Sequence, residues 1–330
     1  MDISILEKTN LMVSNFHELK KGFEFDSRLI KHFVAMVHAE EGKTIDLERL
    51  QEVKSYIKRE TTLGSYFRGT NTLILASLLS FEENYKGFFS NILYVFDRMR
   101  EKGFKRSMYL PLAAYTIVKR SEKDNWSYTI DRMDGFYHKM KENHFWLTSV
   151  DDYVFAAVLA VSELEIEKTA IKIEECYKLL NDSGFYRGND LQTLSHVLAI
   201  GEENSKTKCD RALRLYEKLK AAGCKLQYSG LATLGVLTLI SVDEDEVVRE
   251  IKEVYDYIYE KAGYGFWSLD KNMRTILASC IVSDHYVDEI KKGVLQVALG
   301  NSINAIIIAQ QQAAAAAACA AAASSAASSS

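Results

Sequence analysis

The chain has 330 residues and a formal net charge of −4, so its charge does not indicate a polyanionic partner such as nucleic acid. One proline and 17 glycines are fewer turn formers than sheet-rich proteins need, which argues against a β fold and predicts an all-α chain. The five cysteines are dispersed without a C-x-x-C pair, and the N-terminus lacks the pattern of a secretory signal. We therefore expect a cytoplasmic protein with unpaired thiols.

Residues 1–45 are predicted to form a helical pair that caps the rest of the chain. Phe16 lies 40 residues before Tyr56, and Tyr56 lies 40 residues before Phe96, but Gly22 follows Phe16 early. Terminal units of helical arrays differ from internal ones because one of their sides faces solvent. We therefore assign this segment as an N-terminal cap.

A recurring sequence motif dominates residues 46–292. It starts with an aromatic anchor, carries Met, Leu or Ile three positions later, and in most copies ends on glycine followed by an aromatic residue or cysteine. Its copies start at Phe96, Tyr137, Tyr177, Tyr216 and, in looser form, Tyr255, with spacings of 41, 40, 39 and 39 residues. A constant period near 40 residues predicts an α-solenoid-like array of helical hairpins.

The first helix of each hairpin carries this motif. Apolar residues four before and three after each anchor place one apolar face on the helix. Gly103, Gly184, Gly223 and Gly263 are predicted to cap these helices in the left-handed conformation, with the next side chain folded back on the helix. His144 replaces glycine in one copy, which predicts a different cap there.

The second helix of each hairpin is shorter and rich in small residues. Small side chains allow helices to approach closely, so we place these helices on the interior of the array. They include residues 112–118, 155–160, 194–199, 231–237 and 276–281.

Residues 293–330 break the pattern. No charged side chain follows Lys292, and an apolar stretch leads through Gln310, Gln311 and Gln312 into alanine and serine. We predict an Ala/Ser-rich C-terminal helix that ends in a disordered tail. Membrane contact or self-association through this tail is the alternative, although the glutamines disfavour a true membrane span.

A search for chemistry yields no catalytic, metal-binding or cofactor-binding residues, and we predict no cofactor. No zinc spacing, P-loop or dinucleotide fingerprint is present. His196 is interpreted as a hydrogen-bonded core histidine. The acidic runs at 151–152, 202–203 and 243–246 precede predicted helices, where carboxylates cap free N–H groups.

The segment from Tyr264 to Trp267 is interpreted as an insertion that lengthens the last hairpin loop. The alternative is a solvent-facing aromatic clamp, because exposed Trp and Tyr are favoured at interface hot spots.

Two resemblances follow from the residues. Residues 212–224 are similar to the second helix of a pentatricopeptide repeat, which implies hairpin geometry only, since the period and the base-reading positions differ. Over nearly its whole length, the chain resembles the bacterial family known as domain of unknown function 4003. The repeated Gly-Phe units, residues 66–71 and residues 304–312 carry that resemblance. It implies a bacterial cytosolic protein and no functional residues.

We expect a non-enzymatic helical-repeat scaffold that binds a peptide or protein along a concave groove. One rival is an enzyme whose polar groups converge only in three dimensions. The other rival is RNA binding through residues 51–150, which hold 16 basic and 11 acidic side chains. Its candidate residues are Arg68, Lys105, Arg106, Lys119 and Arg120.

Overall fold

The computed structural model describes residues 1–290 apart from 163, 229, 241 and 242, and it describes the backbone alone for 287–290. The described residues form fourteen α-helices and no strand, so the chain is all-α as predicted. The predicted C-terminal helix and tail, residues 293–330, lie outside the described residues.

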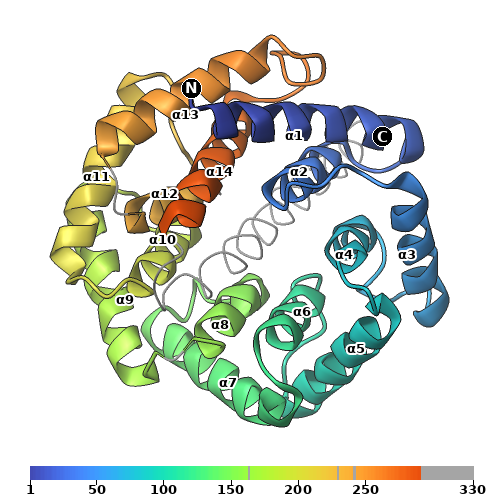
Figure 1. Cartoon of the computed structure of the whole chain (residues 1–330). Coiled ribbons are helices and arrows are strands. Elements are labelled where there is room, and N and C mark those ends of the chain that lie inside the picture. Colours follow the sequence, from blue (N-terminus) through green and yellow to red (C-terminus); the bar gives the residue numbers. More distant parts are fainter. Residues whose placement is uncertain (163, 229, 241–242, 291–330) are drawn as a thin grey trace, which may run out of the picture.

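The helices alternate between two layers (Figure 1). The outer layer consists of α1 (Ile3–Gly22), α3 (Leu47–Glu60), α5 (Tyr85–Lys102), α7 (Trp126–Asn143), α9 (Ile166–Asp182), α11 (Ser205–Ala221) and α13 (Glu244–Tyr259). The inner layer consists of α2 (Arg28–Glu40), α4 (Thr70–Ser80), α6 (Leu110–Arg120), α8 (Tyr153–Ala160), α10 (Asn189–Ala199), α12 (Gly230–Leu239) and α14 (Lys271–Ile290). Short 3₁₀ turns, Lys123–Asn125 and Val150–Asp152, precede α7 and α8.

The two layers close into a ring. Each outer helix contacts the next outer helix, and α1 contacts both α13 and α14. An open array would leave its first and last hairpins apart and would present a concave groove between them. Here the predicted N-terminal cap, residues 1–45, contains α1 and α2 and supplies the hairpin that joins the two ends.

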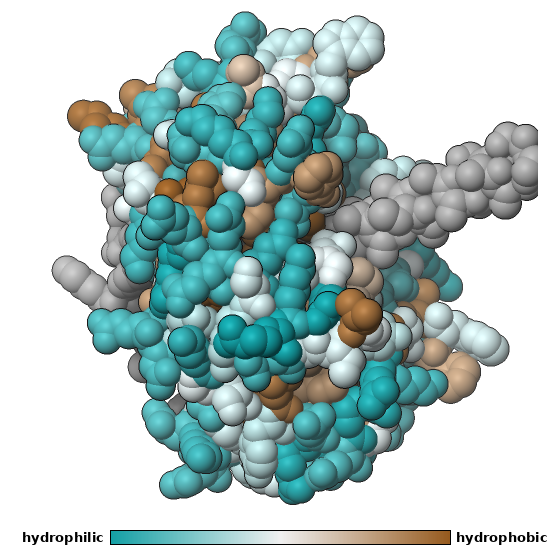
Figure 2. All heavy atoms as spheres, turned by 90° about the vertical axis from the view of Figure 1, so that its right-hand side faces the viewer, coloured by the Kyte–Doolittle hydropathy of each residue, from teal (hydrophilic) through white to brown (hydrophobic). Residues whose placement is uncertain are grey.

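The outer helices bury the apolar face that the repeated motif predicts. The residues three after each anchor are buried without exception, and so are those four before it. They are Met99, Met140, Leu180, Leu219 and Ile258, and Ile92, Met133, Ile173, Ala212 and Ile251. Figure 2, which views the ring from the side of α3, shows a mainly hydrophilic outer surface with scattered hydrophobic side chains. The main core therefore lies between the two layers.

Glycine ends three of the outer hairpin helices as predicted, at Gly103, Gly184 and Gly223. The predicted cap at Gly263 is wrong, because α13 already ends at Tyr259 and Gly263 lies in the loop that follows. Gly103, Gly184, Gly223 and Gly263 all have positive φ, between 78° and 112°. The next residue turns back and is buried: the N–H of Phe104, for example, donates to the carbonyl of Met99 at 3.1 Å. His144 ends α7 at φ −133°, so the predicted different cap is confirmed, and the following Phe145 is exposed.

Acidic residues start several helices as predicted. Asp243 caps α13 by accepting from the N–H groups of Asp245 and Glu246. Ser149 and Asp152 form a reciprocal capping box before α8. Glu203 instead forms an ion pair with Arg211 at 2.7 Å, and Asn204 next to it caps α11.

The inner helices are buried almost all round. All eight residues of α8 are buried, as are nine consecutive residues of α4. Their small residues allow close approach: a Cβ added to Gly235 of α12 would lie 2.8 Å from Cγ1 of Val197 in α10. No helix of the described part is both long and apolar enough to cross a membrane.

Candidate functional site: an aromatic rim and a histidine pocket

The loops that lead from outer to inner helices lie beside one another at one end of the ring. Hydrogen bonds between successive hairpins establish this arrangement. The side-chain amide of Asn71, at the start of α4, donates to the carbonyl of Met108 before α6 at 2.7 Å. The N–H of Lys105 donates to the hydroxyl of Tyr153 at the start of α8 at 3.0 Å. Further links of this kind join Gln192 to Thr148 and Gln227 to Asn272.

Exposed aromatic side chains concentrate on these loops. Tyr186 is 94% exposed, and Trp146 and Trp267 are each 91% exposed. We define the aromatic rim as the exposed large hydrophobic residues of these loops: Phe25, Leu63, Tyr66, Phe145, Trp146, Tyr186, Tyr228, Phe266 and Trp267. Six of the seven loops contribute to it. Such exposure has no packing benefit in a ring that buries most of its other aromatic residues.

The loops at the opposite end differ. Among the described residues of the connections from inner to outer helices, no large hydrophobic side chain is exposed. Most of the other exposed ones, such as Tyr94, Tyr128 and Ile171, lie singly on the outer helices. The two ends of the ring therefore have different surface chemistry.

Local sequence explains why one aromatic residue points in and the next points out. In the loop after α9, Phe185 follows the capping glycine and is buried, whereas the next residue, Tyr186, is exposed. In the loop after α13, Tyr264 is buried while Phe266 and Trp267 are exposed. The alternative of a solvent-facing clamp at 264–267 thus has two exposed members. The sequence reasoning missed Trp146 and Tyr186, whose signal is a second aromatic residue directly after Phe145 and Phe185 of the repeated motif.

The five basic residues considered for RNA binding do not share one surface. Lys105 and Arg106 are exposed at the same end as the aromatic rim. The guanidinium of Arg68 is turned back onto the backbone carbonyls of Lys58 and Thr61. The remaining two stand at the last residues of α6, at the opposite end of the ring, where Lys119 pairs with Glu82 and burial lowers the pKa of Arg120.

A small pocket, the histidine pocket, lies between α7, α9 and α10. It is lined by Phe136, Lys139, Met140, Asn143, His144, Ala170, Ile173, Glu174 and His196. Nε2 of His144 lies 2.9 Å from Oε1 of Glu174, and Nδ1 of His196 lies 4.0 Å from Oδ1 of the buried Asp152. Its enclosed space is about large enough for a single water molecule.

Burial shifts the charges of this pocket toward neutrality. Desolvation lowers the pKa of His196 to about 3, and the positive charge of His144 adds to that effect. Desolvation, together with the charge of Asp151, raises the pKa of Asp152 to about 8. Both ring nitrogens of His196 lack a hydrogen-bond partner. The prediction of a core histidine is thus confirmed for burial and wrong for its hydrogen bond, because even the carboxylate of Asp152 lies 4.0 Å from Nδ1, beyond hydrogen-bond distance.

The other buried histidines belong to the core. His32 of α2 stacks on Phe16 with ring centroids 3.8 Å apart, and burial lowers its pKa to about 3. His38 on the same helix packs beside Phe81, and burial lowers its pKa to about 4. In the described part of the chain, no group of three or more His, Cys, Asp or Glu side chains is arranged to hold a metal ion.

Comparisons with known proteins identify the family. The family model described as "Protein of unknown function (DUF4003)" matches residues 15–312. The chain is 26% identical over 311 residues to "Uncharacterized protein YeaA" of Bacillus subtilis (strain 168), which covers 92% of this chain and 91% of that protein. No solved structure matches the chain. The chain therefore belongs to the DUF4003 family, as the resemblance in its sequence predicted.

Proposed function

We propose that the chain is a non-enzymatic helical-repeat scaffold that binds a protein or peptide partner through the aromatic rim. The observation that carries this proposal is the concentration of exposed Trp, Tyr and Phe on the loops of one end of the ring. Trp and Tyr dominate binding hot spots because they bury a large area at a small cost in conformational entropy. The loops that present them are fixed by glycine caps and hydrogen bonds between hairpins, so little ordering is needed on binding.

The helical-repeat part of this proposal interprets each hairpin as one copy of a unit of about 40 residues. It is supported by the recurrence of the same glycine cap at Gly103, Gly184 and Gly223. It is also supported by Gly69 and Gly188, which precede α4 and α10 at matching positions, both with positive φ. The likeness to pentatricopeptide repeats extends this interpretation to hairpin geometry alone. We place the protein in the cytoplasm, since Cys176, Cys209, Cys224 and Cys280 are free thiols.

The experiment compares three full-length proteins as baits in native lysate, followed by binding of the purified partner. The rim variant carries Trp146→Ser, Tyr186→Ser and Trp267→Ser. The control variant carries Tyr94→Ser, Tyr128→Ser and Ile171→Ser, which removes exposed hydrophobic residues from the outer helices instead. We expect the wild type and the control to retain the same partner and the rim variant to lose it. Retention of that partner by the rim variant would refute the role of the rim.

An enzyme is the second candidate, and the histidine pocket favours it. His144, Glu174 and His196 meet there although they are far apart in sequence, and Asp152 lies behind them. General acid–base catalysis uses such groups when their pKa values are shifted by burial. The pocket has space for about one water molecule, so a substrate could enter only if the pocket opened. A turnover screen in which wild type is active and His144→Gln is inactive would establish this alternative over the scaffold.

RNA binding is the weaker alternative, because Lys105 and Arg106 are the exposed members of its five candidate residues at the rim. A phosphate-binding surface needs several cations that act together, and its affinity is greatest at low salt. A gel shift with single-stranded RNA at low salt should therefore show no retardation.

A further inference from the structure

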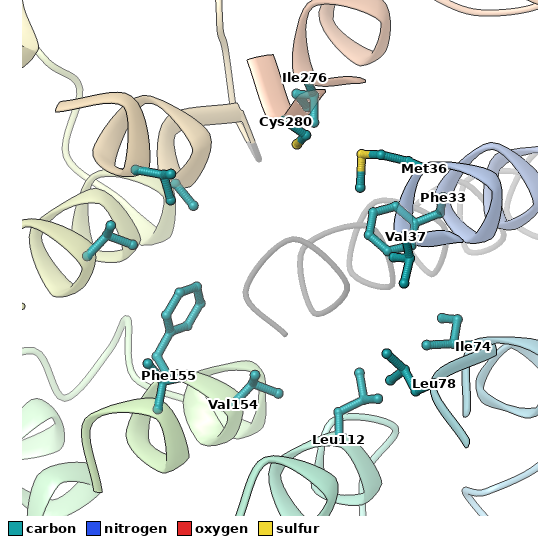
Figure 3. Close-up of a cluster of buried hydrophobic side chains, with 14 of the residues drawn as sticks. Phe33, Met36, Val37, Ile74, Leu78, Leu112, Val154, Phe155, Ile276 and Cys280 are labelled. Carbon is teal, nitrogen blue, oxygen red and sulfur yellow. The ribbon is translucent and has the colours of Figure 1, made fainter. Parts of the chain in front are cut away.

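The inner helices form a second apolar surface, which faces the axis of the ring. Side chains from α2, α4, α6, α8 and α14 point toward one central space (Figure 3). We define the inner wall as the labelled members of this set: Phe33, Met36, Val37, Ile74, Leu78, Leu112, Val154, Phe155, Ile276 and Cys280. None of them is more than 5% exposed. A wall of this kind is stable only when an apolar group fills the space that it encloses.

We propose that the inner wall binds the chain's own C-terminal segment, residues 293–312. The first argument is connectivity. The last described helix, α14, contributes Ile276 and Cys280 to the wall and ends at Ile290, so the segment follows in sequence directly after a helix of the inner layer. An occupant that is covalently attached at this point has a high effective concentration and needs no second molecule.

The second argument is chemistry. No charged side chain follows Lys292, whereas each outer helix carries several Lys, Arg, Asp or Glu side chains and the uncharged inner helices α4, α8 and α12 are only 8 to 11 residues long. Burial of an unpaired charge against the wall would be strongly unfavourable, and this segment avoids such a charge over its whole length. Its apolar residues include Val294, Leu295, Val297, Leu299, Ile303, Ile306, Ile307 and Ile308.

The third argument is extent. Twenty residues in helical form would reach about 30 Å, which is more than the length of inner helices such as α4 and α6. The family match ends at residue 312, so it includes this segment and omits most of the alanine and serine tail beyond it. The occupant is therefore assigned to 293–312, and residues 313–330 are left outside the wall.

Thiol protection in the full-length protein tests the proposal. Cys280 belongs to the wall, whereas Cys176, Cys209 and Cys224 are buried elsewhere and report general unfolding. Ile307→Asp places a charge in the segment, and Ala317→Asp places the same charge in the tail as a matched control. We expect Ile307→Asp to accelerate alkylation of Cys280 by about tenfold or more, with the other three thiols and the control protein unchanged. An unchanged rate at Cys280 in Ile307→Asp would overturn the proposal.

A second measurement decides the case in which Ile307→Asp exposes Cys176, Cys209, Cys224 and Cys280 together by unfolding the protein. The photo-reactive residue p-benzoylphenylalanine replaces Ile307 in one full-length protein and Ala317 in another. Benzophenone reacts readily with methionine, and Met36 stands on the wall. Adducts on Met36 or its wall neighbours from position 307, and not from position 317, are expected. Adducts from position 307 that lie off the wall, or equal wall adducts from both positions, would overturn the proposal.

Discussion

The aromatic ring of Tyr264 lies 5.3 Å from that of Phe16, edge to face, and this contact joins the last hairpin to the first. The same relationship occurs inside the ring. Phe104 contacts Tyr137 at 6.1 Å, and Phe185 contacts Tyr216 at 4.9 Å. In each case the residue after a glycine of positive φ packs on the aromatic anchor of the next hairpin. The repeated sequence motif therefore specifies a contact between neighbouring hairpins as well as a helix cap.

Gly263 is the position where this closing contact is most sensitive. Gly223 and Gly263 both have positive φ, but a Cβ at Gly263 would lie 2.3 Å from Cε1 of Phe16, whereas nothing lies within 4 Å of one at Gly223. We expect Gly223→Ala to cost about 1–2 kcal/mol for its left-handed backbone. Gly263→Ala should cost about 1–3 kcal/mol more, because Phe16 must move. Chemical denaturation measures the loss in free energy of unfolding for both variants. Equal losses would show that Phe16 can move away from the added methyl group without strain.

Tyr177 tests whether the anchors belong to the core. It is 9% exposed, it packs beside His144 with ring centroids 4.3 Å apart, and its hydroxyl accepts from the N–H of Gly188. Tyr177→Ala should lower the free energy of unfolding by roughly 3–5 kcal/mol, as large-to-small core changes do. Tyr177→Phe, which keeps the ring and loses the hydrogen bond, should cost about 1 kcal/mol. A small effect of the alanine variant in urea or guanidinium denaturation would mean that the anchor contributes little to packing.

Much of the local structure could be predicted because it depends on residues close in sequence. The helix that ends at Gly103, the return of Phe104 and the buried row that includes Met99 all follow from periodicity and cap chemistry within one turn or two. The exceptional cap at His144 followed for the same reason. These features need no knowledge of how one hairpin sits on another.

Ring closure and the histidine pocket could not be predicted from the sequence, because both depend on the angles between hairpins. Small differences in helix packing, such as the close approach of Gly235 to Val197, set the turn from one hairpin to the next. Accumulated over seven hairpins, they decide whether the ends meet. The packing of one hairpin on the next also brings His144 and His196 into one pocket, although the repeated motif places them in different hairpins.

Arg132 is another residue whose role depends on packing between helices. From α7 its guanidinium donates to the carbonyls of Ala160 and Ser162 at 2.9 Å each and to that of Leu164 at 2.5 Å. It thereby satisfies carbonyls at and beyond the end of α8, which have no partner within the helix. Arg132→Met should cost about 1.5–3 kcal/mol, the value of hydrogen bonds from a charged donor.

The matched control for Arg132 is Arg98→Met. Arg98 forms an exposed ion pair with Glu101 one turn away on α5, at 2.6 Å. Exposed pairs of this kind contribute about 0.3–0.5 kcal/mol, so its loss should be barely measurable. If thermal or chemical denaturation gave the two variants the same stability, the contacts of Arg132 with the end of α8 would not contribute to the fold.

His196 makes the stability of the ring depend on pH in a predictable direction. Its folded-state pKa is about 3, against about 6.5 for an unfolded histidine. Below pH 6.5 the unfolded chain therefore binds a proton that the folded chain does not bind. The stabilisation is complete above pH 6.5 and is lost progressively as the pH falls toward 3. Asp152 acts in the opposite sense, since its raised pKa of about 8 favours the folded state at low pH.

His196→Leu separates these contributions. Because both ring nitrogens lack partners, leucine removes no hydrogen bond, and we expect little loss of stability at pH 7. Between pH 7 and about pH 4.5 the wild type should lose about 2–3 kcal/mol more than the variant, since each pH unit below 6.5 costs about 1.4 kcal/mol for one neutral buried histidine. Denaturant titrations of both proteins at the two pH values measure this difference. Parallel losses in the two proteins would mean that His196 is protonated in the folded state, with Glu174 or Asp152 ionised as its counter-charge.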